Sequence, residues 1–220
     1  MTPRQKMIAG IGAAVVAGGV AAVALSRTAS AAPGDPDLVT LDELKELTPR
    51  LTDEKRRAYL PLLNAALREW NITTIPRIAA ALGQWLHESW QFSALVEIAP
   101  NVEAYANNAG LGNAGNVADA ARYIGRGVTQ LTGRSNYTRA GAALGLDLVN
   151  RPELAADPVH AFRIAGWFWV KGSSADFNVL ADRGDFLGIT KKLNGGTNGL
   201  ADREKYHAQA LAIFARRQSK

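Results

Sequence analysis

The 220-residue sequence contains no cysteine and only three histidines. The absence of cysteine excludes a disulfide scaffold and any thiolate metal site, but exported proteins do not require disulfides, so the compartment stays open. His87, His160 and His207 lie far apart in the sequence and lack metal-ligand spacing. We therefore expect no bound metal and no other cofactor.

The sequence also lacks a strong excess of charge in its main part. Hydrophobic residues make up 47% and charged residues 20%, as in globular proteins. The net charge is +5, yet residues 1–31 contain three of the 25 basic residues and no acidic one, which leaves 22 basic against 20 acidic residues. The basic balance is thus weak evidence for a nucleic-acid partner, and we expect none.

An uncharged run spans residues 7–26 and follows two basic residues. As a helix, Met7–Leu25 would be about 28 Å long, just enough to cross a bilayer. Positive charge before the run favours an orientation with the bulk of the chain outside. Ala29-Ser30-Ala31 looks like a signal cleavage site, so residues 1–31 are either a cleaved signal peptide or a membrane anchor.

Residues 32–39 are rich in Pro, Gly and Asp and indicate a linker, and residues 40–220 indicate one mainly α-helical domain. Thr40 and Glu43 fit a capping box, and Thr52 can cap a helix that Pro61 kinks or restarts. Further helices are predicted at Pro158–Lys171 and around Tyr206–Phe214. Residues 99–127 resemble a loop, with a small β-hairpin expected near 97–125.

A predicted helix that starts near Pro76, capped by Thr73 or Thr74, is the most informative stretch. One side of it has helical spacing and is apolar or small: Ile78, Leu82, Trp85 and Ser89. Glu88 ends this helix and Glu97 follows nine residues later. Packing against Trp85 or Trp90 would raise the pKa of Glu88, as a general acid requires, and glycoside hydrolysis needs a second carboxylate. The alternative is that both glutamates are ordinary solvated residues.

The string from Tyr123 to Tyr137, YIGRGVTQLTGRSNY, is the most specific in the chain. It is not a dinucleotide fingerprint, because Gln130 stands where the third glycine is required. Its glycines allow backbone to approach a ligand closely. Gln130, Thr132 and Asn136 are neutral hydrogen-bonding residues of the kind that bind sugar hydroxyl and acetamido groups.

Together with this string, several other motifs resemble the glycoside hydrolases of family 19, and within them phage endolysins more than plant chitinases: His87-Glu88-Ser89, Leu111-Gly112-Asn113, Asn136-Tyr137 and Leu193-Asn194-Gly195-Gly196. The resemblance runs from about residue 52 to 215. It implies a lysozyme-like, mainly α fold with an active-site cleft, and inverting hydrolysis of β-1,4 bonds next to N-acetylhexosamines.

By this resemblance, Glu88 is the general acid, Glu97 the general base, and Thr132 helps to hold the attacking water. Substrate-binding roles are implied for a further set: Tyr123, Gln130, Asn136, Asn194 and Arg203, the last of which can also orient a catalytic carboxylate. The residues after Phe92 depart from the endolysin pattern, which makes Glu103 a rival of Glu97 as the base.

The sequence therefore predicts an exported, monomeric peptidoglycan hydrolase that acts on glycan strands and lyses bacterial cells. By resemblance, the segment at residues 7–26 would tether it to the inner membrane and then release it into the periplasm; secretion after cleavage near Ala31 is the alternative. Two other functions stay open: a secreted chitinase and a sugar-binding protein without catalytic activity.

Overall fold

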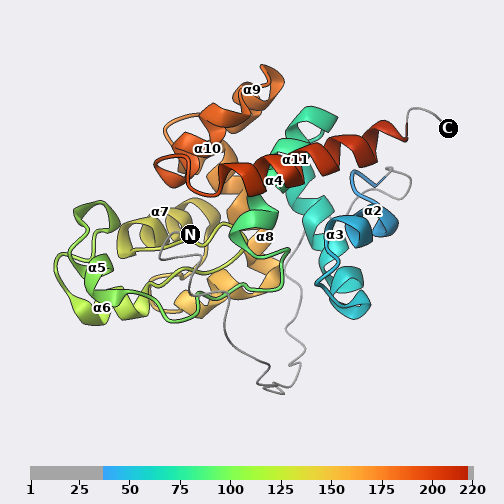
Figure 1. Ribbon diagram of the computed structural model, residues 1–220. Coiled ribbons are helices and arrows are strands. Elements are labelled where there is room, and N and C mark those ends of the chain that lie inside the picture. Colours follow the sequence, from blue (N-terminus) through green and yellow to red (C-terminus); the bar gives the residue numbers. More distant parts are fainter. Residues whose placement is uncertain (1–36, 218–220) are drawn as a thin grey trace.

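The computed structural model describes residues 37–217, and it is built from helices joined by loops of varied length (Figure 1). The helices of the first half are α2 (Leu41–Leu47), α3 (Asp53–Glu69), α4 (Ile75–Glu88), α5 (Val102–Ala106), η1 (Ala109–Leu111) and α6 (Val117–Arg122). Those of the second half are α7 (Arg134–Leu144), η2 (Pro152–Ala156), α8 (Pro158–Trp167), η3 (Phe168–Gly172), α9 (Phe177–Asp182), α10 (Phe186–Asn194) and α11 (Leu200–Ala215).

The predicted helix starts are confirmed by their caps. Thr40 and Glu43 form the expected capping box of α2, and Thr52 caps α3. Pro61 lies inside α3, which runs through it as one helix instead of restarting there. Thr74, not Thr73, caps α4, and the proline after Ile75 occupies its first turn, where the missing N–H is not needed.

Helix α4 lies at the centre of the fold, alongside α11 (Figure 1). Its predicted apolar side is buried, with Leu82, Trp85 and Ser89 fully inaccessible. Gly83 permits the close approach of α11, because a Cβ there would lie 2.9 Å from Cβ of His207. Helix α3 packs on α8, and most large apolar side chains of these four helices belong to one core.

Residues 97–125, expected to contain a hairpin, form the short helices α5, η1 and α6 instead. The β structure recorded in the described part consists of two isolated antiparallel bridges, Val96 with Arg126 and Arg126 with Leu131. The hairpin prediction was wrong because asparagine side chains cap the short helices: Asn101, Asn108 and Asn116 each accept a backbone N–H.

The predicted leader, residues 1–31, lies outside the described residues, as does most of the predicted linker. Within residues 37–217, no helix combines the length and apolar character needed to cross a bilayer.

Candidate active site

Glu88 is the last residue of α4, and its side chain is only 6% exposed. The expectation was an indole ring against this carboxylate. The structure places the guanidinium of Arg203 there, from α11, with Nη2 donating to Glu88 Oε1. Trp85 instead packs edge-on against Trp169 in the core, and Trp90 lies beneath the guanidinium of Arg50.

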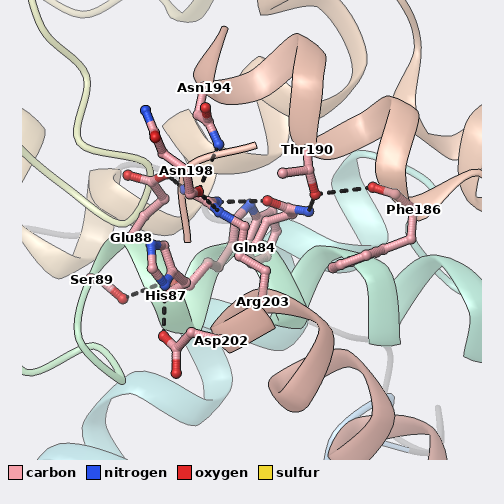
Figure 2. Close-up of polar contacts among 11 residues, drawn as sticks. Gln84, His87, Glu88, Ser89, Phe186, Thr190, Asn194, Asn198, Asp202 and Arg203 are labelled. Carbon is pink, nitrogen blue, oxygen red and sulfur yellow. Dashed lines mark hydrogen bonds and ion pairs between the residues drawn. The ribbon is translucent and has the colours of Figure 1, made fainter. Parts of the chain in front are cut away.

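Three acceptors hold the guanidinium of Arg203, whose side chain is 3% exposed (Figure 2). Besides Glu88, Nη1 donates to Gln84 Oε1 over 2.6 Å and Nε donates to the Asn198 carbonyl over 3.2 Å. The amide of Gln84 donates in turn to Thr190 Oγ1 over 2.7 Å. A buried charge is costly unless its hydrogen bonds are made, so this network fixes Arg203 and, through it, the Glu88 carboxylate.

Asn194 and His87 flank this network in Figure 2. The amide of Asn194 donates to the Asn198 carbonyl over 3.0 Å, while its buried Oδ1 has no hydrogen-bond partner among the described residues. Buried polar atoms normally have a hydrogen-bond partner, so this oxygen is an acceptor left unsatisfied beside the Arg203 network. His87 Nδ1 lies 2.7 Å from Asp202 Oδ2, so this histidine is hydrogen-bonded to the start of α11.

Glu97 is partly buried, and both of its carboxylate oxygens accept hydrogen bonds. Tyr105 donates its hydroxyl to Oε1 over 2.5 Å, and the Gly125 N–H donates to Oε2 over 3.0 Å. The Glu97 N–H also donates to the Gly125 carbonyl over 2.8 Å, so both the backbone and the side chain of Glu97 are hydrogen-bonded to Gly125. The rival base Glu103 is exposed on the first turn of α5.

A side chain at position 125 would collide with two neighbouring side chains. A Cβ at this position would lie 2.9 Å from Gln130 Oε1 and 3.0 Å from Glu97 Oε2. Both polar groups therefore converge on the glycine. Gln130 adopts a left-handed backbone conformation with φ of 53°, and its amide donates to the Gly127 carbonyl over 3.0 Å. This strained turn aims the side chain of Gln130 toward Glu97.

Thr132 and Asn136 continue from Gln130 along the chain. Thr132 Oγ1 donates to the Gln130 carbonyl over 2.8 Å, and the amide of Asn136 donates to the Thr132 carbonyl over 2.8 Å. The structure thus joins three of the sequence-predicted residues, Gln130, Thr132 and Asn136, in one chain of hydrogen bonds beside Glu97.

Tyr123, which the sequence placed among the substrate-binding residues, is 2% exposed and donates its hydroxyl to the Val149 carbonyl over 3.0 Å. Its ring packs against Tyr137 in a second core. Tyr137 donates to the Ile124 carbonyl over 2.7 Å, and burial raises the pKa of Tyr137 to about 12, so it stays a donor. Tyr137 therefore supports the backbone next to Gly125, and both tyrosine side chains are buried instead of lying at the surface.

A short connection links the two carboxylates. The Ala94 N–H donates to the Ser89 carbonyl over 3.0 Å, which closes the chain into a turn directly after Glu88. Glu97 is the third residue after Ala94, at most about 10 Å of extended chain away. The Leu95 carbonyl accepts from the Gly127 N–H over 2.8 Å and ties this connection to the glycine-rich string.

Gln84 and Tyr105 contribute to the site, although the sequence analysis did not identify them as site residues. Gln84 lies four residues before Glu88, so both project from the same side of α4, and this spacing could have signalled it. Tyr105 gave no comparable signal, because its contact with Glu97 depends on how α5 folds back.

Comparisons with known proteins match the part of the chain that contains these residues. Residues 72–180, which include both glutamates and the glycine-rich string, match the family model of class I chitinases. The chain carries a glycoside hydrolase family 19 domain. Chitinase 11 of Oryza sativa subsp. japonica is 60% identical over 53 residues, which are 24% of this chain and 21% of that protein. An endochitinase of Arabidopsis thaliana is 38% identical over 120 residues, 54% of this chain and 39% of that protein.

The matched segments of this family 19 domain thus span from about a fifth to two fifths of these relatives' length. Chitinase C from Streptomyces griseus has the same fold over most of its length, with a TM-score of 0.67 at 22% identity, covering 84% of this chain and 96% of that one. Another bacterial family 19 chitinase gives a TM-score of 0.64 at 21% identity. The prediction of a helix-rich, lysozyme-like fold is confirmed.

Proposed function

We propose that this family 19 domain hydrolyses β-1,4 bonds between N-acetylhexosamines with inversion, using Glu88 as general acid and Glu97 as general base. The observation that carries the proposal is the pair of carboxylates held in unlike surroundings a few residues apart. Glu88 is almost fully buried beside Arg203, whereas Glu97 is partly exposed and fixed by two donors. Inversion requires one protonated and one ionised carboxyl group with room for a water between them.

The contacts suit these roles. A protonated Glu88 can keep accepting from Arg203 through its carbonyl oxygen while its O–H faces the leaving glycosidic oxygen. Arg203 does not depend on Glu88 alone, since Gln84 and Asn198 hold it as well. In its ionised form, Glu97 can take a proton from the attacking water. Thr132, next to Gln130 in the hydrogen-bonded chain, would help to hold that water.

For the substrate, we favour chitin-type polymers of N-acetylglucosamine. The sequence pattern favoured the glycan strand of peptidoglycan, but the relatives found by comparison are named chitinases and endochitinases. Peptidoglycan is the second candidate, because its strands contain the same β-1,4 bond next to an N-acetyl group and the motif strings resemble those of endolysins.

The central experiment compares Glu88→Gln, Glu97→Gln and Glu103→Gln on colloidal chitin and on purified peptidoglycan. We expect the first two variants to lose hydrolysis while keeping the fold, and Glu103→Gln to remain active. Early NMR spectra of the products of the unmodified protein should show the α-anomer. Robust activity of Glu88→Gln, or a β-anomer, would reject the mechanism; binding without hydrolysis would favour the sugar-binding alternative.

We further propose that residues 1–31 export the protein, by signal cleavage near Ala31 or as a membrane anchor that is later released. Cell fractionation over time distinguishes the two routes. Immediate cleavage at Ala31 without a membrane-bound full-length form would reject the anchor, and a full-length protein that stays in the cytoplasm would reject export.

A further inference from the structure

Three consecutive residues have a left-handed backbone, and the run starts two residues after Glu88. The φ angles of Trp90, Gln91 and Phe92 are 51°, 62° and 62°, and none of the three is glycine. For a residue with a Cβ, this conformation is unfavourable, because the Cβ comes too close to the carbonyl oxygen of the backbone. Such a run persists only where its surroundings over-determine it, and strained backbone of this kind concentrates at functional sites.

The turn is held by all three side chains. Phe92 is fully buried, with its ring 5.2 Å from that of Phe162. The guanidinium of Arg50 lies 4.5 Å from the ring of Trp90. Gln91 is 7% exposed, and its side chain makes the hydrogen bonds that join the turn to other elements, so it is the residue whose removal tests the turn without opening a large cavity.

The amide of Gln91 bridges two separate elements. Its Oε1 accepts from the Arg50 N–H over 3.1 Å, in the connection between α2 and α3, and its Nε2 donates to the Tyr206 hydroxyl over 3.1 Å, on α11. Helix α11 also carries Arg203, the partner of Glu88. The same helix therefore anchors both the acid and the turn that leads to the base.

We propose that Gln91 is a positioning residue, a proposal that rests on the proposed function. Its two side-chain hydrogen bonds hold the left-handed turn that sets the position of Glu97 relative to Glu88. The direction in which the chain leaves α4 determines whether Ala94 can bond to Ser89 and Leu95 to Gly127. Glu97 follows two residues after Leu95, so these bonds set its place. Gln91 touches neither carboxylate in this role and acts through the backbone.

The test separates positioning from simple stabilisation. Gln91→Gly removes both hydrogen bonds but also relieves the backbone strain, so its melting temperature should stay close to that of the unmodified protein. Gln91→Ala removes the bonds and keeps the strain, so it should melt lower. Both variants should lose kcat on a chitin oligosaccharide by about 10-fold, because misplacement of a catalytic group lowers kcat, with KM changed less than about twofold.

Tyr206→Phe removes one of the two anchors while keeping the ring, which covers the case in which the Gln91 variants fold poorly. Its loss of kcat should be smaller, and the double variant with Gln91→Ala should be no slower than Gln91→Ala alone, because both remove the same contact. Asn71→Gly is the matched control: Asn71 also has a positive φ of 54°, but it lies before α4, at the end of the helix remote from Glu88. This control should keep full kcat.

Full kcat in Gln91→Gly, or a loss that follows the melting temperatures of the two Gln91 variants, would overturn the inference. So would a rise in KM at constant kcat. These outcomes differ from failure of the proposed function, which would appear as an inactive unmodified protein or an active Glu88→Gln variant.

Discussion

Replacing Gly125 with alanine tests directly whether Glu97 is the base. The added Cβ would meet Gln130 Oε1 at 2.9 Å and Glu97 Oε2 at 3.0 Å, against the 3.4–4 Å of an ordinary contact. The carboxylate must therefore retreat by about half an ångström, and the hydrogen bond from the Gly125 N–H is weakened. Since a misplacement of about 1 Å can cost about 100-fold in rate, we expect kcat to fall about 10-fold.

The structural cost of the same change should be small. The atoms that the Cβ meets are the ends of flexible side chains, so we expect the lower limit of the penalty for overpacking, about 1 kcal/mol. In a domain of this size that corresponds to a melting temperature lower by about 2–4 °C. The assay is steady-state kinetics on a soluble chitin oligosaccharide, with thermal unfolding measured on the same preparation.

Gly184→Ala provides the matched control. Gly184 has a φ of 71°, and a Cβ there would meet no atom within 4 Å, so alanine adds backbone strain of about 1 kcal/mol without displacing a neighbour. This variant should lose similar stability and keep its kcat. A well-folded Gly125→Ala protein with a kcat within twofold of the unmodified one would refute the reasoning, because the position of Glu97 would then not matter for the rate.

Further predictions concern the partner of Glu97, the acid side of the stability profile and local opening. Tyr105→Phe removes the donor to Glu97 Oε1 and should lower kcat about 10-fold with little change in KM, given that hydrogen bonds to charged groups are worth about 1.5–3 kcal/mol. Burial lowers the pKa of His207 in the folded protein below its ordinary value. As the pH falls below about 6.5, the unfolded chain therefore binds more protons than the folded protein, and the free energy of unfolding should decrease. The variant His207→Phe keeps the stack on Phe186, and its melting temperature should fall less steeply with decreasing pH. Residues 101–122 bury few side chains, so their amides should exchange with solvent faster than those of α4 in a hydrogen-exchange experiment.

The elements that the sequence predicted well are those whose signals are local. The stripe of α4 and the cap at Thr74 lie within one helix, and a buried helix satisfies its backbone internally whatever packs on it. Glu88 could be found for the same reason, since a carboxylate at the end of such a helix is conspicuous. Its neighbour Arg203 was implied only by the family resemblance, because Arg203 follows 115 residues later and only the packing of α11 on α4 brings it there.

Short, polar segments were predicted less well. In residues 97–125, the glycines and asparagines indicated turns, and the structure uses the asparagines as caps of helices five or six residues long. Helices this short carry little periodicity, so the pattern cannot separate them from loops. Tyr105 was missed with them, although it donates to the carboxylate proposed as the base.

The left-handed turn at residues 90–92 could not have been predicted, because its residues oppose the conformation that they adopt. Tryptophan, glutamine and phenylalanine all disfavour positive φ, and the local sequence contains no glycine between Gly83 and Gly110 that would signal a turn. The conformation is enforced from outside, by Arg50 before α3, Phe162 on α8 and Tyr206 on α11. Tertiary contacts thus override local preference at the point where the chain passes from one proposed catalytic carboxylate to the other. Conflicts of this kind concentrate where function needs the resulting geometry, and here the turn sets the path from Glu88 to Glu97.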